Sequence, residues 1–198
     1  PCIAFGQTKS GGIYFLNIRL SDELTTEYKE TNNSRTFLNS FSESAIFPDN
    51  LLDSIKNKAE SLCSSKLEAN VKCIYKISKK GKQITSIGAN GEIEGMPVNT
   101  FKGAESSSKT DYYIKIDVLM HNGGKAVIIN GNMSKIKPVV NGYVKVFDPE
   151  KNVVWKNNVT LKDFSTLRSV QYTKGDITIT KSETFSPEDI YMIYLTTL

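Results

Sequence analysis

Three features of the sequence predict an α+β fold, in which a largely antiparallel or mixed β-sheet carries helices on one face. A segment with helical spacing of apolar residues is followed directly by one with strand alternation. The later strands come in pairs joined by turn sequences, and the last residues have helical spacing again. A chain of 198 residues without a long polar tract fits one domain with long loops, and two small domains also fit this length.

The composition is that of a folded globular protein, since 39% of the residues are hydrophobic and the chain has nine Tyr and nine Phe. The net charge of +4 is too small and too dispersed to predict a nucleic-acid partner. We interpret one local basic cluster as a solvated loop: Lys76, Lys79, Lys80 and Lys82. No stretch approaches the roughly 20 apolar residues that span a bilayer, so we expect no transmembrane segment. Peripheral or lipid-tethered membrane association stays open, as does the oligomeric state.

The first seven residues, Pro-Cys-Ile-Ala-Phe-Gly-Gln, have the pattern of the end of a secretory signal peptide. They resemble the Bacteroidetes style of signal peptide, in which an apolar stretch ends in Ala-x-Gly before Gln. We therefore expect residues 1–6 to be a signal-peptide remnant, residues 7–198 to be a single α+β domain, and the protein to be secreted or periplasmic. A buried N-terminal strand is the alternative. Lipidation of Cys2 is disfavoured, because a lipobox cysteine follows a small residue rather than Pro1.

The first part of the chain holds one strand and the strongest helix. The apolar residues 13–20 predict a strand, and the polar stretch 21–46 predicts a long loop. A helix at about 48–66 follows, because Pro48 takes the first helical position and Asp49 lies near the positive end of the helix dipole. Its apolar residues recur at helical spacing and define one stripe that must be buried: Leu51, Leu52, Ile55, Ala59, Leu62 and Cys63.

Strands and hairpins dominate the rest of the chain. Residues 71–77 alternate as a strand, and residues 78–109 predict a second long loop with a short strand near 84–87. Three hairpins are then expected, and they join residues 112–120 to 125–129, residues 143–147 to 153–161, and the residues on either side of 174–176. Ser186-Pro187 opens a closing helix at 187–198.

Two cysteines lie close together in the predicted fold. Cys63 belongs to the helix stripe and Cys73 to the apolar face of the next strand, so both point into one interface. A disulfide between them would close a short loop and contribute about 2 to 3 kcal/mol in an oxidising compartment. From the turn near residue 67, however, four helical residues cover about 6 Å and five strand residues about 16 Å, so the thiols can miss each other. A disulfide and two separate buried thiols therefore both stay open.

We find no constellation typical of a catalytic, metal or cofactor site, and predict no such residues. His121 is the only histidine and falls in a predicted turn, and the chain has no Cys-x-x-Cys pair. No Gly-x-Ser-x-Gly elbow is present, and the glycine-rich stretch 88–95 fits neither the phosphate loop nor the dinucleotide fingerprint. The alternative is a carbohydrate-active or hydrolytic enzyme that uses loop carboxylates such as Glu92, Glu94 and Asp111.

The order of elements from residue 47 onward resembles an α+β domain of the bacterial cell envelope. It is similar to that of the outer-membrane activator lipoproteins of penicillin-binding proteins, and to the N-terminal domain of the periplasmic TolB protein. The resemblance rests on the helix and strand of residues 48–77, the strand that begins Asp111-Tyr112-Tyr113-Ile114, and the hairpin of residues 143–155. It implies a non-catalytic module that docks onto envelope proteins, as expected for secreted Bacteroidetes proteins with such a domain.

The sequence thus predicts a secreted or periplasmic binding module whose partner is another envelope protein and not a nucleic acid. Exposed aromatic residues often anchor interfaces, so four of them are candidates for the interaction surface: Tyr112, Tyr113, Tyr143 and Trp155. Aromatic residues of strands also serve as core residues, and the alternation around Tyr112 favours its burial.

Overall fold

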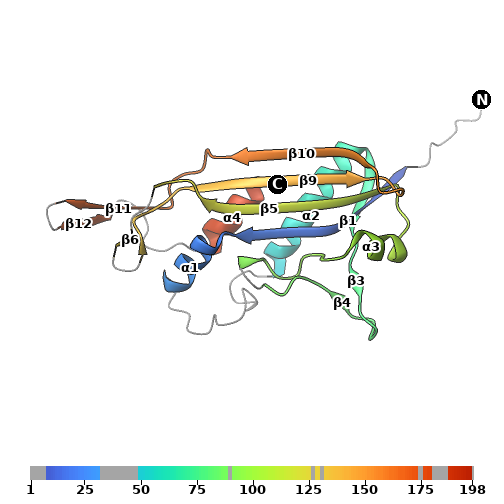
Figure 1. The fold of residues 1–198 in the computed structure, drawn as a ribbon, viewed down its shortest axis with the longest axis horizontal. Coiled ribbons are helices and arrows are strands. Elements are labelled where there is room, and N and C mark those ends of the chain that lie inside the picture. Colours follow the sequence, from blue (N-terminus) through green and yellow to red (C-terminus); the bar gives the residue numbers. More distant parts are fainter. Residues whose placement is uncertain are drawn as a thin grey trace, which may run out of the picture.

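The computed structural model describes residues 8–31, 49–88, 91–125, 128–129, 132–173, 176–179 and 187–197. Its central sheet has five strands in the order β10-β9-β5-β1-β2 (Figure 1). They span Lys9–Leu20 (β1), Ala69–Cys73 (β2), Tyr112–Asn122 (β5), Pro138–Phe147 (β9) and Val153–Leu161 (β10). β1 runs parallel to β2 and β5, while β9 is antiparallel to both β5 and β10. The predicted α+β fold with a mixed sheet is confirmed.

Two helices pack on one face of this sheet, as the sequence predicts. α2 spans Asp49–Leu67 and α4 spans Pro187–Thr197, and both lie behind the strands in Figure 1. Ile55 of α2 and Ile190 of α4 are fully buried there. The strand residues beneath the helices alternate with outward-facing ones, with one shift at the bulge after Ile13, and form the main core: Ile13, Leu16, Ile18, Leu20, Ile114, Ile116, Val118, Met120, Val140 and Val146. No helix within the described residues is long and apolar enough to cross a membrane.

Side chains of α2 close the outer edge of β2. Ser64 Oγ accepts a hydrogen bond from the Val71 N–H at 3.1 Å, and Glu60 Oε1 accepts one from the Cys73 N–H at 2.8 Å. Glu60 Oε2 also pairs with Lys72 Nζ at 2.8 Å. The N–H groups that an edge strand usually offers to another strand are therefore used within the chain.

The stretch 21–46 is not a loop throughout, because helix α1 spans Asp22–Thr31. The Thr25 N–H donates to the Ser21 carbonyl oxygen at 2.9 Å, and Leu24 is fully buried against the main core. Leu24 and Tyr28 are the only apolar residues of this helix, so its sequence has too little periodicity to predict it. Residues 32–46 of the expected loop lie outside the described residues.

The predicted loop 78–109 also holds regular structure. β3 (Lys76–Ile77) and β4 (Gln83–Ile84) form a short antiparallel hairpin, which includes the predicted strand near residue 84. Helix α3 spans Phe101–Ser107, and the Thr100 hydroxyl accepts a hydrogen bond from the Gly103 N–H as its N-cap. A helix this short carries little periodicity, and the cap is its clearest sequence signal.

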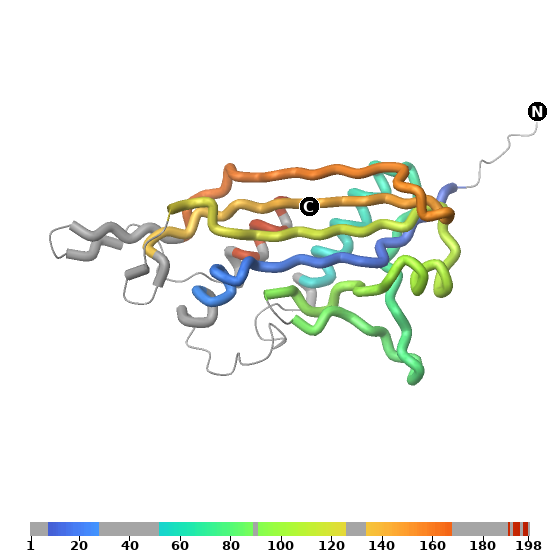
Figure 2. Tube along the Cα trace, viewed as in Figure 1, coloured from blue at the N-terminus to red at the C-terminus, as the bar shows by residue number. Residues whose placement is uncertain are grey.

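Residues 91–99 complete the edge of the sheet beside β1. The Ile93 N–H donates to the Ile18 carbonyl oxygen at 2.8 Å, and the Leu16 N–H donates to the Pro97 carbonyl oxygen at 2.9 Å. On this side, β1 therefore pairs with β2 over its first residues and with residues 91–99 over the rest. Figure 2 shows β2 and residues 91–99 in succession along β1.

One of the three predicted hairpins is wrong. β5 does not pair with residues 125–129, because its antiparallel partner is β9 and the Asn122 side chain bonds the backbone of Lys135 and Lys137. The β9–β10 hairpin and the pair around residue 174 are confirmed. The remaining strands are β6 (Ile128–Ile129), which pairs with β7 (Asn132–Met133), and β8 (Lys135–Ile136), β11 (Arg168–Thr173) and β12 (Asp176–Ile179), which form a small sheet.

Candidate functional site: the open face of the sheet

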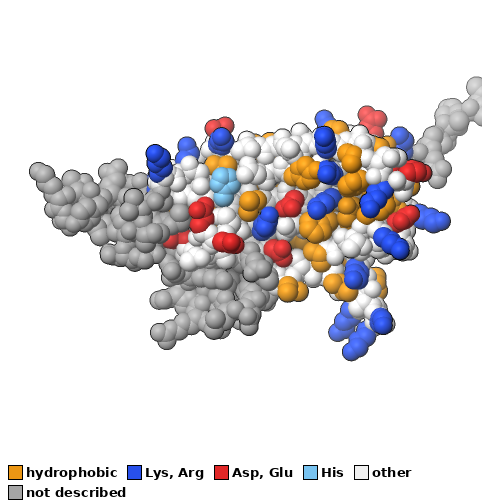
Figure 3. Space-filling model, in the orientation of Figure 1, with side chains coloured by type: hydrophobic (Ala, Val, Ile, Leu, Met, Phe, Trp, Pro, Cys, Tyr) orange, Lys and Arg blue, Asp and Glu red, His pale blue; other side chains and the backbone are white. Residues whose placement is uncertain are grey.

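The face of the sheet opposite α2 and α4 is the most extended polar surface on the described strands. We call it the open face, and Figure 3 shows hydrophobic and basic side chains gathered over its half nearest α3. Its side chains alternate with the buried core residues along each strand, and each is half-buried or exposed. They are Asn17 and Arg19 of β1; Lys115, Asp117, Leu119 and His121 of β5; Asn141, Tyr143, Lys145 and Phe147 of β9; and Lys156, Asn158 and Thr160 of β10.

Three lysines stand side by side across the strands of the open face. Lys115 of β5 is directly opposite Lys145 of β9, and Lys145 is directly opposite Lys156 of β10. We call this set the lysine row. Like charges directly opposite one another in a sheet are destabilising. None of the three forms an ion pair with another described residue. The stability of the fold therefore does not explain why three lysines lie in register here.

Two of the three ammonium groups of the row lie over aromatic rings. Lys115 Nζ is 4.6 Å from the ring centroid of Phe15, which is its cross-strand neighbour on β1, and Lys145 Nζ is 5.2 Å from that of Tyr143. Such cation–π contacts at exposed sites contribute about 0.5–1 kcal/mol each, and they hold the lysine stems against the sheet. At these two rings, the open face consequently exposes a lysine ammonium group instead of an uncovered aromatic ring.

A cluster of aromatic residues under α3 supports one end of the open face. The ring centroid of Phe101 in α3 lies 4.9 Å from that of Tyr113 and 5.8 Å from that of Phe147, while Tyr14 packs against Phe101 at 6.1 Å. A bulge at Tyr14 in β1 places this residue in the cluster together with its neighbour Phe15. The cluster fixes the floor beside the lysine row.

The other end of the open face is uncharged overall and shallow. Asp117 Oδ1 accepts a hydrogen bond from Asn17 Nδ2 at 3.1 Å and lies 4.0 Å from Arg19 Nε, so its charge is neutralised locally. Across the sheet, Thr160 Oγ1 donates to Asn141 Oδ1 at 2.8 Å. Arg19, Asp117, Asn141 and Thr160 line a concavity of about 400 Å³.

The four aromatic residues predicted to form an interaction surface do not come together. Tyr143 lies on the open face, as that prediction requires. Tyr113 does not belong to an exposed surface, because it is 1% exposed in the aromatic cluster and donates a hydrogen bond to the Ser108 carbonyl oxygen. Tyr112 and Trp155 are half-buried on the opposite, helix-covered face. The position of each residue in the alternation along its strand decides on which face of the sheet its side chain lies.

An apolar groove of about 570 Å³ lies on the helix-covered side, where α2 leaves part of β9 and β10 uncovered. We call it the α2–β10 groove. Trp155 of β10 lines it together with Val144 and Val146 of β9, and Leu62 of α2 borders it with 43% of its surface exposed. This groove is the second candidate for a docking site.

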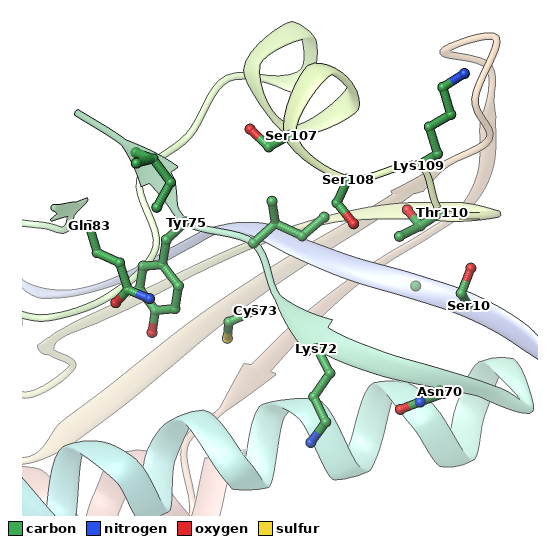
Figure 4. A pocket seen from close by; sticks show the side chains of 13 residues that line it. Ser10, Asn70, Lys72, Cys73, Tyr75, Gln83, Ser107, Ser108, Lys109 and Thr110 are labelled. Carbon is green, nitrogen blue, oxygen red and sulfur yellow. The ribbon is translucent and has the colours of Figure 1, made fainter. Parts of the chain in front are cut away.

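A third hollow of about 470 Å³ lies between β2 and the end of α3 and is shown in Figure 4. Its lining is mostly hydroxyl and amide side chains, with Ser10 and Asn70 at one end and Tyr75 beside Gln83 at the other. Burial, helped by the nearby Cys73 and Glu60, raises the pKa of Tyr75 to about 12. A neutral phenol is neither an activated nucleophile nor a base, and of the other lining residues Lys72 is paired with Glu60.

Cys63 and Cys73 are both free and half-buried in the structure, and they pack against the same core. Burial raises the pKa of the Cys63 thiol to about 11. Burial, together with the neighbouring Glu60 carboxylate, raises that of Cys73 to about 12. Thiols of this kind are poor nucleophiles at neutral pH. A disulfide between them in an oxidising compartment stays a prediction.

The loop carboxylates considered for hydrolysis are dispersed. Asp111 accepts hydrogen bonds from the backbone and side chain of Ser10 at the start of β1, and these bonds lower its pKa. Glu92 forms an isolated backbone β-bridge with Arg19 near the other end of β1. In a strand of that length, this end lies about 30 Å from Ser10. Burial raises the pKa of Glu94, which lies in the turn after Glu92. Glu92 and Glu94 therefore lie too far from Asp111 to share one site with it.

His121 does not take part in a catalytic arrangement among the described residues. It is half-buried at the end of β5, and its Nδ1 lies 3.3 Å from the Asn122 carbonyl oxygen. The described residues hold no group of three or more His, Cys, Asp or Glu side chains that would bind a metal ion.

In comparisons with known proteins, no family model, no curated protein sequence and no solved structure matches this chain.

Proposed function

We propose that this chain is a non-catalytic binding domain that acts through protein contacts, with the open face as its binding surface. One observation carries this proposal: α2 and α4 bury the core residues of β1, β2, β5 and β9 on one side of the sheet, whereas the other side keeps its polar and aromatic side chains half-buried or exposed. Aromatic residues are enriched in protein interfaces, and charged residues belong mainly to their rims.

The chemistry of the described residues favours binding over catalysis. Of the carboxylates considered for hydrolysis, Asp111 lies at one end of β1 and Glu92 at the other, and Asp117, which lines the concavity of the open face, is paired with Asn17 and Arg19. A general acid and a base within reach of one substrate are the minimum for hydrolysis of this type.

We also propose a secreted or periplasmic location, with another envelope protein as the partner. This rests on the pattern of residues 1–7, which lie outside the described residues. Mass spectrometry of the mature protein from its native host tests it. We expect a first residue of Gln7 or its pyroglutamate form, and an intact Pro1 would contradict the proposal.

Site-specific photo-crosslinking tests the binding surface. A photoreactive phenylalanine analogue at Tyr143 samples the open face, and the same analogue at Leu62 samples the α2–β10 groove on the other side. In cells of the native host we expect a discrete crosslinked protein from position 143 and none from position 62. Crosslinks from position 62 alone would place the binding surface in the α2–β10 groove.

A further inference from the structure

We propose that the lysine row binds an acidic segment of the partner protein, an inference that rests on the proposed binding function of the open face. The row places three cations on adjacent strands in direct register. Strands lie about 4.8 Å apart, so the three side chains leave the sheet within about 10 Å of one another. Their mutual repulsion is relieved when carboxylates bind between them.

The surroundings of the row leave its charge unneutralised within the described chain. Asp117, the acid on the next row, is already engaged by Asn17 and Arg19. Asp148, at the end of β9, accepts hydrogen bonds from the backbone and side chain of Asn152. The positive charge of Lys115, Lys145 and Lys156 is thus available to a ligand.

Spacing and side-chain length fit an extended acidic segment. Carboxylates on alternate residues of an extended peptide are about 7 Å apart. Lysine ammonium groups are single point charges on flexible stems, and they can adjust to that separation across three strands. A segment with two or three carboxylates that crosses β5, β9 and β10 would pair with the whole row.

The rings next to the row favour a protein ligand over a single-stranded nucleic acid. Nucleic-acid strands bind by stacking their bases on free aromatic faces. Here the rings of Phe15 and Tyr143 each carry a lysine of the row over one face, and Phe147 packs within the aromatic cluster. Asp117 also interrupts the positive surface after one row, which suits a short acidic segment better than a uniformly charged polyanion.

Fluorescence anisotropy with a labelled peptide of alternating Glu and Ser tests the proposal. The test variant carries Lys115→Gln, Lys145→Gln and Lys156→Gln. The matched control carries Lys79→Gln, Lys80→Gln and Lys82→Gln in the exposed β3–β4 hairpin, so its net charge changes by the same amount. We expect the test variant to bind the peptide about tenfold more weakly than the wild type at low salt, and the control to bind it almost unchanged.

A charge-reversed variant distinguishes the loss of the binding site from a folding defect in the test variant. The variant with Lys115→Glu, Lys145→Glu and Lys156→Glu should no longer bind the Glu-Ser peptide and should bind a Lys-Ser peptide instead. Equal weakening by the row and hairpin variants would overturn the proposal, and so would absence of peptide binding to the wild type at low salt. Tighter binding of an oligothymidylate than of the peptide would assign the row to nucleic acid instead. If position 143 still crosslinks a partner while the peptide fails to bind, the proposed binding surface survives and the acidic partner does not.

Discussion

The two faces of the central sheet are built from the same strands but have different physical roles. In β5, Ile114, Ile116 and Val118 are at most 3% exposed under the helices, while their neighbours Lys115 and Asp117 point to the open face. Burial of aliphatic side chains stabilises the fold, and each fully buried one contributes about 1.5–3 kcal/mol. The like charges of the lysine row oppose folding, and the cation–π contacts of Lys115 and Lys145 offset part of this repulsion. The strand alternation therefore separates the residues that stabilise the fold from those of the proposed binding surface.

The largest expected effect is on the covered face. Ile114→Ala removes a fully buried side chain at the centre of the main core and should lower the free energy of unfolding by about 2–5 kcal/mol. Urea denaturation followed by circular dichroism measures it. Lys115→Gln, one residue along on the open face, is the control and should stay within about 1 kcal/mol of the wild type. If both variants lowered the free energy of unfolding equally, the two faces would not differ in their contribution to stability.

Thiol reactivity reports on the same covered side. The pKa of Cys63 is about 11 against an ordinary 9.0, so at pH 8 its thiolate fraction is about 100-fold lower than that of a free thiol. Alkylation by iodoacetamide, followed by mass spectrometry, should be slower by about this factor in the native protein than in urea, and Cys73 should react still more slowly. Fast native alkylation would show that the interface opens. Resistance of both residues in urea without reductant would reveal the disulfide.

An intermediate effect is expected where α2 closes β2. Glu60→Ala leaves the Cys73 N–H without its acceptor and should lower the free energy of unfolding by about 1–3 kcal/mol at pH 7. Glu60→Gln keeps an oxygen acceptor and should cost less.

The effect of Glu60 should depend on pH. Desolvation by burial raises the pKa of Glu60, but the hydrogen bonds from Lys72 and Cys73 outweigh it, and the net pKa lies below the ordinary 4.5. The stabilisation is therefore present above about pH 4.5 and is lost as the pH falls through the lower folded-state pKa. Unfolding curves of wild type and Glu60→Ala should converge on acidification, and a constant difference down to pH 3 would contradict this.

The smallest effect is on the open face and has the opposite sign. Lys156→Gln removes one member of the lysine row without removing a cation–π contact, and should raise the free energy of unfolding by about 0.2–1 kcal/mol at low salt. High salt should abolish the gain, because charges at this surface are screened over about 10 Å at 0.1 M ionic strength. Lys80→Gln in the β3–β4 hairpin is the control. Destabilisation by Lys156→Gln would mean that the row is satisfied within the chain.

Local sequence signals predicted the parts of the fold that depend on local structure. Pro48 and Asp49 with the spacing of Ile55 and Ala59 predicted α2, and the turn at Asp148-Pro149 predicted the β9–β10 hairpin. Pairing between distant strands has no local signal. The parallel neighbours of β1 and the choice of β9 over residues 125–129 as the partner of β5 follow from packing in three dimensions.

The candidate site was out of reach of the sequence for the same reason. Lys145 and Lys156 are brought together by the register of one hairpin, but Lys115 joins them only through the β5–β9 pairing. The role of Tyr143 in an interface stays a prediction. The alternation around Tyr112 already favoured its burial, whereas the side on which Trp155 lies depends on the position of α2.

The closed edge of β2 also limits how copies of this chain can associate through their strands. Glu60 and Ser64 occupy the outward N–H groups of β2, whereas β10 pairs with β9 alone among the described residues. A second copy that added a strand at β2 would have to displace Ser64 and Glu60 from the N–H groups of Val71 and Cys73, whereas no such bonds among the described residues oppose pairing along β10.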